Sequence, residues 1–489
     1  MMNSGTLVDR RLEAGHGDKV AIRCAGEEVT YAQLHGRICA AGNLLAERGI
    51  GREDRVLMVL DDTPTFPALF LGAMRMGAVP APVSFLDTTE NFAHYARDSY
   101  AKLIVAEDHL LERLPAGAMS RTAFEEHLRK HEGLTDPADI HPDDMAFWLF
   151  SGGSTGFPKG VVHLHHNIPY TCETFAKEIL QITERDVTFS STKLYHAYGL
   201  GNNLTFPYWV GATTVLRMGK PDPRGLLETA QANRPSLFFS VPTLYGAMVN
   251  LPDAADHDLS SVRFCVSAAE PLAPEVYRRW KAAFDLDIVD GIGSTELLHI
   301  YCSNRPGDVK PGTSGKPVPG YELVLLDELG QPVPRGEVGN LHVRGDSALA
   351  YYWHQHDKSK AAIKGDLFFT GDRYRENDEG NYVYEGRADD MIKIGGLWAS
   401  PIEIENALVE HPRVLEAAAV GVDADFTTRV KAFIIVRGEE GDEALVLELQ
   451  EWCKSRLRRY EFPHFITFVE ELPKTPTGKI QRYKLREEA

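Results

Sequence analysis

Residues 145–160 read MAFWLFSGGSTGFPKG, an apolar run followed by a loop of small residues that ends in Pro-Lys-Gly. The apolar run, 145–150, is typical of a buried strand. In the loop, glycines let backbone N–H groups crowd around phosphate oxygens, hydroxyl groups add donors, and Lys159 adds a positive charge. The spacing does not match a Walker A loop. The stretch predicts a polyphosphate-binding loop, with an ordinary surface loop as the alternative.

Strand-like and helix-like segments alternate on both sides of this loop. A helix is predicted at 31–49, where Thr30 and Gln33 stand at the spacing of a capping box, and another at 66–79. Such alternation favours an α/β fold with largely parallel sheets. Buried strands are predicted between the helical stretches, at 55–60, 103–108, 187–192, 213–218 and 262–268.

The last third of the chain has a different pattern of predicted elements. Short strands and turns after about residue 310 predict a β-rich subdomain within a large N-terminal domain of layered α/β sheets, 1–388. A small α+β C-terminal domain is predicted at 389–489, where Ser400, Pro401 and Glu403 indicate a helix start. Its other expected elements are strands at 417–422 and 431–436 and an amphipathic helix at 445–460.

The composition limits the class of protein. A chain of 489 residues exceeds what one core usually supports, so at least two domains are expected. Its 70 acidic residues against 52 basic ones give a net charge of -18, which argues against a nucleic-acid-binding protein. The six cysteines form no CxxC pair, so neither a zinc site nor a disulfide framework is indicated. Neither a signal peptide nor a long apolar run is present, so we expect a cytoplasmic protein without a membrane span.

The loop SGGSTGFPKG at 151–160 resembles the phosphate loop of adenylate-forming enzymes, which include acyl-CoA synthetases, carrier-protein adenylation domains and luciferases. Segments 193–207 and 291–304 are similar, more narrowly, to benzoate-CoA ligases, and the resemblance covers nearly the whole chain apart from a shorter stretch between 107 and 145. Further stretches resemble other motifs of the family in the same order: GIGSTE at 291–296, FFTGD at 368–372, YEGRADDMIKIGG at 384–396 and PKTPTGKIQR at 473–482.

The resemblance implies a two-step reaction. A carboxylate attacks the α-phosphorus of MgATP to give acyl-AMP and pyrophosphate, and a thiol, usually that of coenzyme A, then attacks the acyl carbon. It implies that Glu296 binds Mg²⁺, that Thr295 contacts the α-phosphate, and that Lys479 is the catalytic lysine of the first step. Outside this family, Thr295 and Glu296 would equally fit a helix cap, and Lys479 a solvated surface residue.

The same resemblance implies where the nucleotide binds. Asp372 would accept from the ribose hydroxyls and Arg387 would reach the ribose or a phosphate, although such residues often form an ordinary surface ion pair. Gly152 stands where relatives usually carry a hydroxyl residue, and we expect a weaker grip on the phosphates as a result. The β- and γ-phosphates would be held by Ser151, Ser154, Thr155, Gly156 and Lys159, and the adenine would lie between Ala269 and Glu270 on one side and Asp290, Gly291 and Ile292 on the other.

The C-terminal domain would move between the two steps. Asp389 resembles the hinge about which this domain rotates. Gly395 and Gly396 would line the path of the coenzyme A thiol, because absent side chains leave room for a narrow arm. Trp398 lies beside them and would shape the tunnel or simply pack in the core.

The acid is predicted to be benzoate or a small substituted benzoate. Gly293 would leave a flat slot that His299 closes at its end, which favours a ring over a long chain, although such a histidine is more often an ordinary packed residue. His196 would hydrogen-bond a hydroxyl or amino substituent. The full pocket implied by the resemblance consists of His196, Ala197, Tyr198, Gly293, His299 and Ile300.

Two alternatives to an arylcarboxylate-CoA ligase stay open from the sequence. The first is an aryl-acid adenylating enzyme that transfers the acyl group to a carrier-protein thiol or another nucleophile. The second is a non-catalytic protein that binds an aryl ligand or a nucleotide on the same scaffold. The joint presence of Glu296, Asp372, Arg387 and Lys479 argues against the second.

Overall fold

The computed structural model describes residues 3–130, 133, 135–152, 157–388, 390–394, 397–424, 427–438, 441–458, 460–474 and 480–487. Its largest sheet has nine strands in the order β15-β14-β13-β12-β11-β9-β10-β1-β2, parallel from β13 to β1 and antiparallel at both ends. The strands are β1 Val20–Cys24, β2 Glu27–Thr30, β9 Val187–Ser190, β10 Thr213–Leu216, β11 Leu237–Ser240, β12 Phe264–Ser267, β13 Ile288–Gly293, β14 Ile300–Ser303 and β15 Lys316–Pro317.

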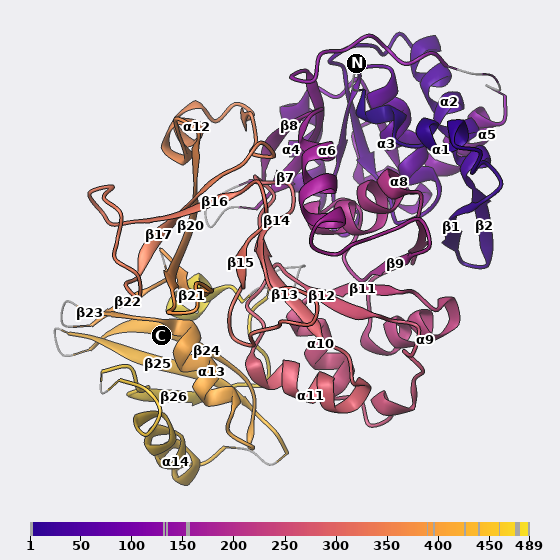
Figure 1. Ribbon diagram of the computed structural model, residues 1–489. Helices are drawn as coiled ribbons and strands as arrows, with labels where there is room; N and C mark the ends of the chain where they lie inside the picture. Colours follow the sequence, from indigo (N-terminus) through magenta and orange to yellow (C-terminus); the bar gives the residue numbers. More distant parts are fainter. Residues whose placement is uncertain are drawn as a thin grey trace.

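A second, fully parallel sheet has the order β4-β3-β5-β6. Its strand β4 contacts α3, which packs against α2 in the N-terminal part of the molecule (Figure 1). The predicted capping box is confirmed, because the Thr30 hydroxyl accepts from the Gln33 N–H and the Gln33 side chain accepts from the Thr30 N–H. The helix predicted at 66–79 ends earlier, at Arg75, and the last predicted residue, Val79, begins β4. The bounds are β3 Arg55–Val59, β4 Val79–Pro82, β5 Leu103–Ala106, β6 Met119–Ser120, α2 Tyr31–Glu47 and α3 Thr65–Arg75.

The opening stretch of sequence forms a hairpin. Strand β7, Met145–Ser151, runs antiparallel to β8, Lys159–Leu164, and the register places Ser151 opposite Lys159. A two-residue strand from far along the chain, β18 Tyr351–Tyr352, pairs with the other edge of β8. The small-residue loop therefore leaves and re-enters one sheet, and its two ends are held side by side.

The β-rich layer expected after residue 310 is confirmed as an antiparallel sheet. Its order is β16-β17-β20-β19, with β21 pairing on β20. The strands are β16 Glu322–Leu326, β17 Gly339–Arg344, β19 Ile363–Lys364, β20 Leu367–Glu376 and β21 Tyr382–Arg387.

The C-terminal α+β unit has a sheet of its own, β24-β25-β26, and a separate hydrophobic core, and Figure 1 shows it below the β-rich sheet. The Ser400 side chain caps α13 by accepting from the Glu403 N–H, as predicted. The helix predicted at 445–460 ends at Lys454 instead, where Ser455 forms the C-cap. The elements are β22 Ile392–Ile394, β23 Leu397–Ala399, α13 Pro401–Val409, β24 Val414–Ala424, β25 Thr427–Val436, α14 Glu443–Lys454, β26 Phe465–Phe468 and α15 Arg482–Glu487.

The remaining helices cover the sheets or connect their strands. None of the helices in the described ranges is long and apolar enough to cross a lipid bilayer. Two segments are π-helical, Cys172–Lys177 and Gly201–Thr205. The α-helices are α1 Asp9–Glu13, α4 Thr89–Ser99, α5 Arg121–Leu128, α6 Asn167–Thr171, α7 Ala197–Leu200, α8 Phe206–Val210, α9 Pro223–Asn233, α10 Pro242–Val249, α11 Pro274–Phe284 and α12 His356–Ala362.

Candidate active site

Three predicted phosphate-site residues meet in one cluster. Glu296, in the turn between β13 and β14, lies beside the two ends of the β7–β8 hairpin. Ser151 Oγ donates to Glu296 Oε1 at 3.2 Å, and Lys159 Nζ lies 3.6 Å from the same oxygen. Burial lowers the pKa of Lys159 below its ordinary value, and the charge of Glu296 opposes this shift. The ammonium and carboxylate are therefore in place to receive a phosphate and a cation.

A buried histidine fixes the turn that carries Glu296. His163, on β8, donates through Nε2 to the Thr295 carbonyl at 2.8 Å. Burial lowers the pKa of His163 to about 4, so the ring stays neutral at ordinary pH. The backbone at Thr295 is thus tied to the same hairpin that carries the phosphate loop.

No group of three or more metal-ligating side chains occurs among the residues that the structure describes. A single carboxylate in a half-buried position still fits a hard cation such as Mg²⁺, which usually keeps waters and phosphate oxygens as most of its ligands. Glu296 fits that pattern, because a bound triphosphate would bring the other oxygens.

The predicted ribose residues form a pair on adjacent strands. Asp372 on β20 lies opposite Arg387 on β21, with Arg387 Nη1 3.2 Å from Asp372 Oδ1. Gly371 has φ +78°, and a Cβ there would lie 2.6 Å from the Arg387 guanidinium. The positive φ therefore favours glycine in the TGD motif, and a side chain there would also displace the arginine.

The predicted adenine residues lie at the carboxyl ends of β12 and β13. Asp290 is buried, its Oδ1 has no hydrogen-bond partner, and burial raises its pKa to about 8. Gly291 leaves no room for a side chain, since a Cβ would lie 2.7 Å from the Cys302 carbonyl oxygen. Ala269 is exposed with φ +78°, a left-handed conformation that costs a residue with a Cβ on the order of 1 kcal/mol. The Glu270 carboxylate accepts from the Thr243 hydroxyl at 2.6 Å.

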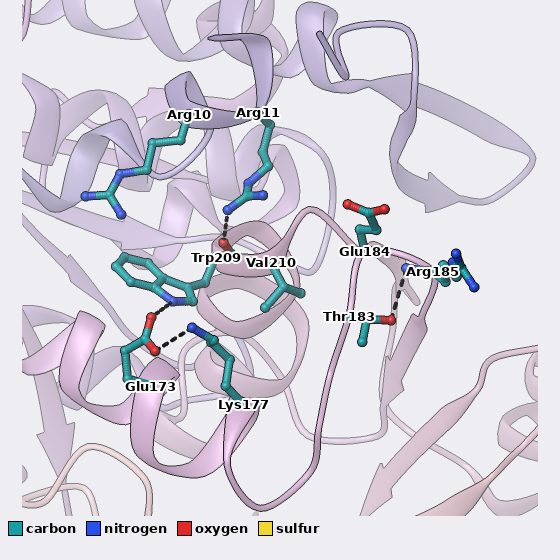
Figure 2. Close-up of a pocket in the computed structure, with 9 residues that line it drawn as sticks. All are labelled: Arg10, Arg11, Glu173, Lys177, Thr183, Glu184, Arg185, Trp209 and Val210. Carbon is teal, nitrogen blue, oxygen red and sulfur yellow. Dashed lines mark hydrogen bonds and ion pairs between the residues drawn. The ribbon is translucent and has the colours of Figure 1, made fainter. Parts of the chain in front are cut away.

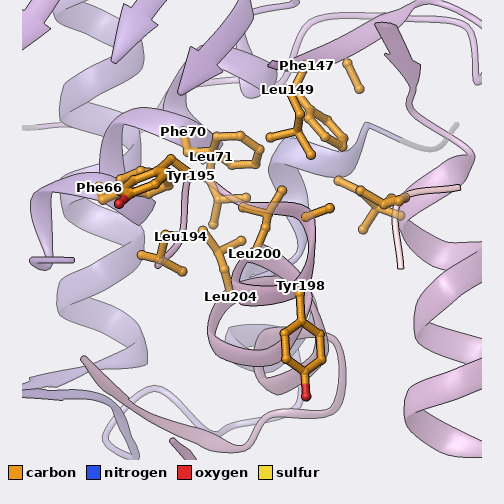
Figure 3. Packing of buried hydrophobic residues seen from close by; sticks show 14 of the residues in the cluster. Phe66, Phe70, Leu71, Phe147, Leu149, Leu194, Tyr195, Tyr198, Leu200 and Leu204 are labelled. Carbon is orange, nitrogen blue, oxygen red and sulfur yellow. The ribbon is translucent and has the colours of Figure 1, made fainter. Parts of the chain in front are cut away.

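The predicted acid-binding residues gather around α7. His196 is the N-cap residue of α7, and Ala197 and Tyr198 are buried in its first turn. Tyr198 donates its hydroxyl to the Val266 carbonyl at 2.9 Å. Figure 3 shows Tyr198 beside Leu200 and Leu204 in the core that includes α3 and β7. The segment that would contact the acid is therefore rigidly packed.

His299 completes this wall from the β13–β14 turn. Its Nε2 lies 3.3 Å from the Tyr198 carbonyl and 3.1 Å from Asn202 Oδ1. A carbonyl only accepts, so Nε2 carries the hydrogen, and the buried Nδ1 is an acceptor without a partner. Burial lowers the pKa of His299 to about 3, so the ring is neutral. Phe206 packs edge-on against it at 4.4 Å between ring centroids.

The role expected for Gly293 needs a refinement. A Cβ at this position would lie 2.6 Å from the His299 carbonyl oxygen. The missing side chain therefore first allows β13 and β14 to approach each other. Ile300 begins β14 and is almost completely buried.

Family models match most of the chain. The model of the AMP-binding enzyme matches residues 9–353, and that of the AMP-binding enzyme C-terminal domain matches residues 403–479. This chain belongs to the AMP-binding enzyme family. The resemblance predicted from the motifs is thereby confirmed.

Individual AMP-binding enzymes match the chain along its whole length. It is 44% identical to a benzoate–CoA ligase of Thauera aromatica, over 98% of this chain and 94% of the relative. A solved benzoate CoA ligase from Burkholderia xenovorans LB400 is 40% identical with a TM-score of 0.93, covering 99% of this chain and 100% of that one. An anthranilate CoA ligase solved with anthranoyl-AMP is 37% identical with a TM-score of 0.95, covering 99% and 97%. The predicted fold class is thereby confirmed as well.

Several predicted site residues of this AMP-binding enzyme lie outside the described residues. Only the backbone of Trp398 is described, in β23 opposite Lys393. The predictions that fall outside are those for Ser154, Thr155, Gly156, Asp389, Gly395, Gly396 and Lys479.

Two residues at the site were missed by sequence reasoning. Tyr352 donates its hydroxyl to Glu296 Oε1 at 3.0 Å, and Asn202 holds His299. Asn202 lies within the segment 193–207 already singled out, so an amide in that segment was a usable signal. No sequence signal pointed to Tyr352, because its partners are far away in the sequence.

A surface pocket of about 570 Å³ lies apart from these residues (Figure 2). None of the predicted site residues lines it. Glu173 accepts from the Trp209 indole N–H at 2.7 Å and pairs with Lys177 at 2.6 Å, and Arg11 donates to the Trp209 carbonyl. These lining groups bind one another, so the pocket adds nothing to the site.

Proposed function

We propose that this chain is an ATP-dependent arylcarboxylate–CoA ligase that activates benzoate or a small substituted benzoate. Benzoate is a carboxylic acid without a good leaving group, and forming acyl-AMP supplies one. The carboxylate oxygen bonds to the α-phosphorus as pyrophosphate leaves. The coenzyme A sulfur then bonds to the acyl carbon, and AMP leaves with the oxygen that bridged the two groups.

One observation carries the proposal. Glu296 and His299 are three residues apart in one turn, yet Glu296 faces the hairpin residues Ser151 and Lys159, while His299 faces the aromatic wall around Tyr198. A single turn thus joins a site for phosphates to a site for a ring. This is the geometry that an acid and ATP need in order to react.

The chain's own residues would mainly orient the two substrates and neutralise the negative charge of the phosphates. Lys159 and Ser151 would hold the outer phosphates, Asp372 and Arg387 the ribose, and Asp290 the adenine side. Glu296 would hold Mg²⁺, which when bound supplies positive charge against the phosphates. Lys479 would stabilise the charge that builds up as the carboxylate attacks, since a cation placed at such a point acts strongly in a water-poor site.

The second step requires the C-terminal domain to rotate. We place the boundary at residue 389, with Asp389 as the hinge, and assign the thiol path to Gly395, Gly396 and Trp398. The small residues leave room for the pantetheine arm. The motif likeness at 384–396 supports this part of the proposal.

The substituent on the ring is the least constrained feature. His299 Nδ1 is a buried acceptor, and benzoate offers it no donor. An amino or hydroxyl group that reached this nitrogen would gain a hydrogen bond that benzoate cannot make. His196, at the start of α7, is a second residue able to contact such a group.

The experiment is an AMP-release screen of benzoate, its hydroxy and amino derivatives, and short and long fatty acids, with and without coenzyme A. We expect AMP release with the aryl acids only, and steady turnover only with coenzyme A. Preference for fatty acids of eight or more carbons, on the order of tenfold, would contradict the aryl assignment. Turnover independent of coenzyme A would point to another acceptor, and no AMP with any acid to a non-catalytic binder.

A further inference from the structure

Tyr352 touches both charged residues of the phosphate site. Its hydroxyl donates to Glu296 Oε1 at 3.0 Å, and Lys159 Nζ lies 3.7 Å from the centroid of its ring. The exposed fraction of Tyr352 is 5%, so its own side chain is shielded from water. The phenol thus binds an anion through its edge and a cation through its face.

The backbone fixes where this phenol stands. Tyr352 pairs with Val161 in the β18–β8 ladder, and the Trp353 N–H donates to the Gly160 carbonyl at 2.9 Å. On the other side, the Leu349 N–H donates to the Glu296 carbonyl at 2.7 Å. The short strand is therefore tied to the residue after Lys159 and to Glu296 itself, and the ring between them has little freedom to move.

The next turn adds a further anchor. The Tyr352 N–H donates to Ser359 Oγ at 3.0 Å, and Ser359 lies in α12. The backbone of Tyr352 is therefore anchored to β8 on one side and to α12 on the other.

The need for such a residue follows from the charges. A lysine and a glutamate 3.6 Å apart attract each other, but ATP requires the ammonium to turn to phosphates and the carboxylate to a cation. An aromatic face attracts an ammonium, and a hydroxyl donor holds a carboxylate oxygen without adding charge. Tyr352 does both, and with Ser151 and Lys159 its contacts fall on Oε1, which leaves Oε2 outside them.

We propose that Tyr352 is a positioning residue that holds Glu296 and Lys159 in the arrangement that receives the cation-bound triphosphate. The inference rests on the proposed function and deepens it. Tyr352 acts through the two charged residues. The hydroxyl orients Glu296 for the cation, and the ring orients Lys159 for the phosphates.

The two halves of the residue can be separated by substitution. Tyr352→Phe removes the hydroxyl and keeps the ring, whereas Tyr352→Leu removes both. Tyr351→Phe is the matched control, because it removes a hydroxyl from the neighbouring residue of the same strand, where the Tyr351 hydroxyl donates to the Met145 sulfur at 3.7 Å and not to a charged residue of the site. Melting temperatures of all variants show whether any of them loses its fold.

The measurement is calorimetric binding of α,β-methylene-ATP, with Mg²⁺ and in its absence. This analogue cannot transfer its adenylate to an acid, because a CH₂ group replaces the oxygen between the α- and β-phosphorus. We expect Tyr352→Phe to weaken binding with Mg²⁺ about tenfold, the effect of losing one charge-assisted hydrogen bond, and to leave Mg²⁺-free binding unchanged. Tyr352→Leu should weaken both. A loss in Tyr352→Phe that is equal with and without Mg²⁺, no loss at all, or an equal loss in Tyr351→Phe would overturn the proposal.

A double-mutant cycle gives an independent readout. In a Glu296→Gln background, Tyr352→Phe should cause little further loss of Mg²⁺-dependent binding, because the carboxylate on which it acts is gone. Additive losses would show that Tyr352 acts elsewhere. The wild-type chain tests the proposed function separately: if it forms no AMP with aryl acids, the function fails whatever the variants bind.

Discussion

The proposal that His299 forms one wall of the acid-binding pocket can be tested with one added methyl group, Gly201→Ala. Gly201 has helical φ and ψ of -61° and -57°, so alanine suits the backbone. Its Cβ, however, would lie 2.3 Å from His299 Cδ2, 2.6 Å from Nε2 and 3.1 Å from Phe206 Cζ. Non-bonded carbons need about 3.5 Å, so the imidazole must move by roughly 1 Å.

The size of the effect follows from overpacking. Inserting a methyl group into a packed core costs about 1–3 kcal/mol, which corresponds to about 5- to 150-fold in kcat/KM if the strain falls on the acid pocket. We expect that loss for benzoate in AMP release at saturating ATP and coenzyme A. Calorimetric binding of the ATP analogue should stay unchanged, because the phosphate site uses the other side of the turn.

A second glycine provides the control. Gly36 lies in α2, and a Cβ added there would have no neighbouring atom within 4 Å, so Gly36→Ala should leave activity unchanged and stabilise the helix by up to ~1 kcal/mol. If Gly201→Ala keeps its kcat/KM for benzoate, His299 does not wall the acid site. The same conclusion follows if Gly201→Ala weakens binding of the ATP analogue by the same factor as it lowers kcat/KM for benzoate.

Three further outcomes are expected. Lys479→Ala should slow adenylation about a hundredfold or more while thioester formation from synthetic benzoyl-AMP suffers much less, and equal losses in the two assays would remove its assigned role. Asp372→Ala should raise KM for ATP on the order of tenfold with little change in KM for benzoate, as initial rates would show. Because burial raises the pKa of Asp290 to about 8, the folded chain keeps a proton that the unfolded chain loses above about pH 4, so this group's stabilisation is lost as pH rises towards 8. Asp290→Asn should therefore flatten the fall in unfolding free energy between pH 6 and 8 in urea titrations, and an unchanged slope would contradict the raised pKa.

Sequence patterns predicted helix caps correctly, because a cap depends on residues close together in the chain. The capping box at Thr30 and the cap at Ser400 depend on residues three apart, and both are confirmed. The helix expected to run to residue 460 ends at Lys454, although the apolar spacing continues. The pattern 66–79 likewise contains both the end of α3 and the start of β4, because both are buried and periodicity alone cannot separate them.

The site shows the limit of such reasoning more sharply. Motifs identified Glu296 and Lys159, and the structure brings them together. Tyr352 could not be found in this way, since its role depends on a two-residue strand pairing across a long stretch of the chain. The glycine at 293 was assigned to the acid slot, whereas the close approach of β14 also requires it. Long-range pairing decided both points.

The central claim is that a ring acid becomes an acyl-adenylate before it becomes a thioester. The most direct measurement uses benzoate labelled with ¹⁸O in its carboxylate, with ATP and coenzyme A, followed by mass spectrometry of the AMP. The account predicts one labelled oxygen in each AMP formed, because the bridging oxygen comes from the acid. Unlabelled AMP formed together with benzoyl-CoA would contradict it.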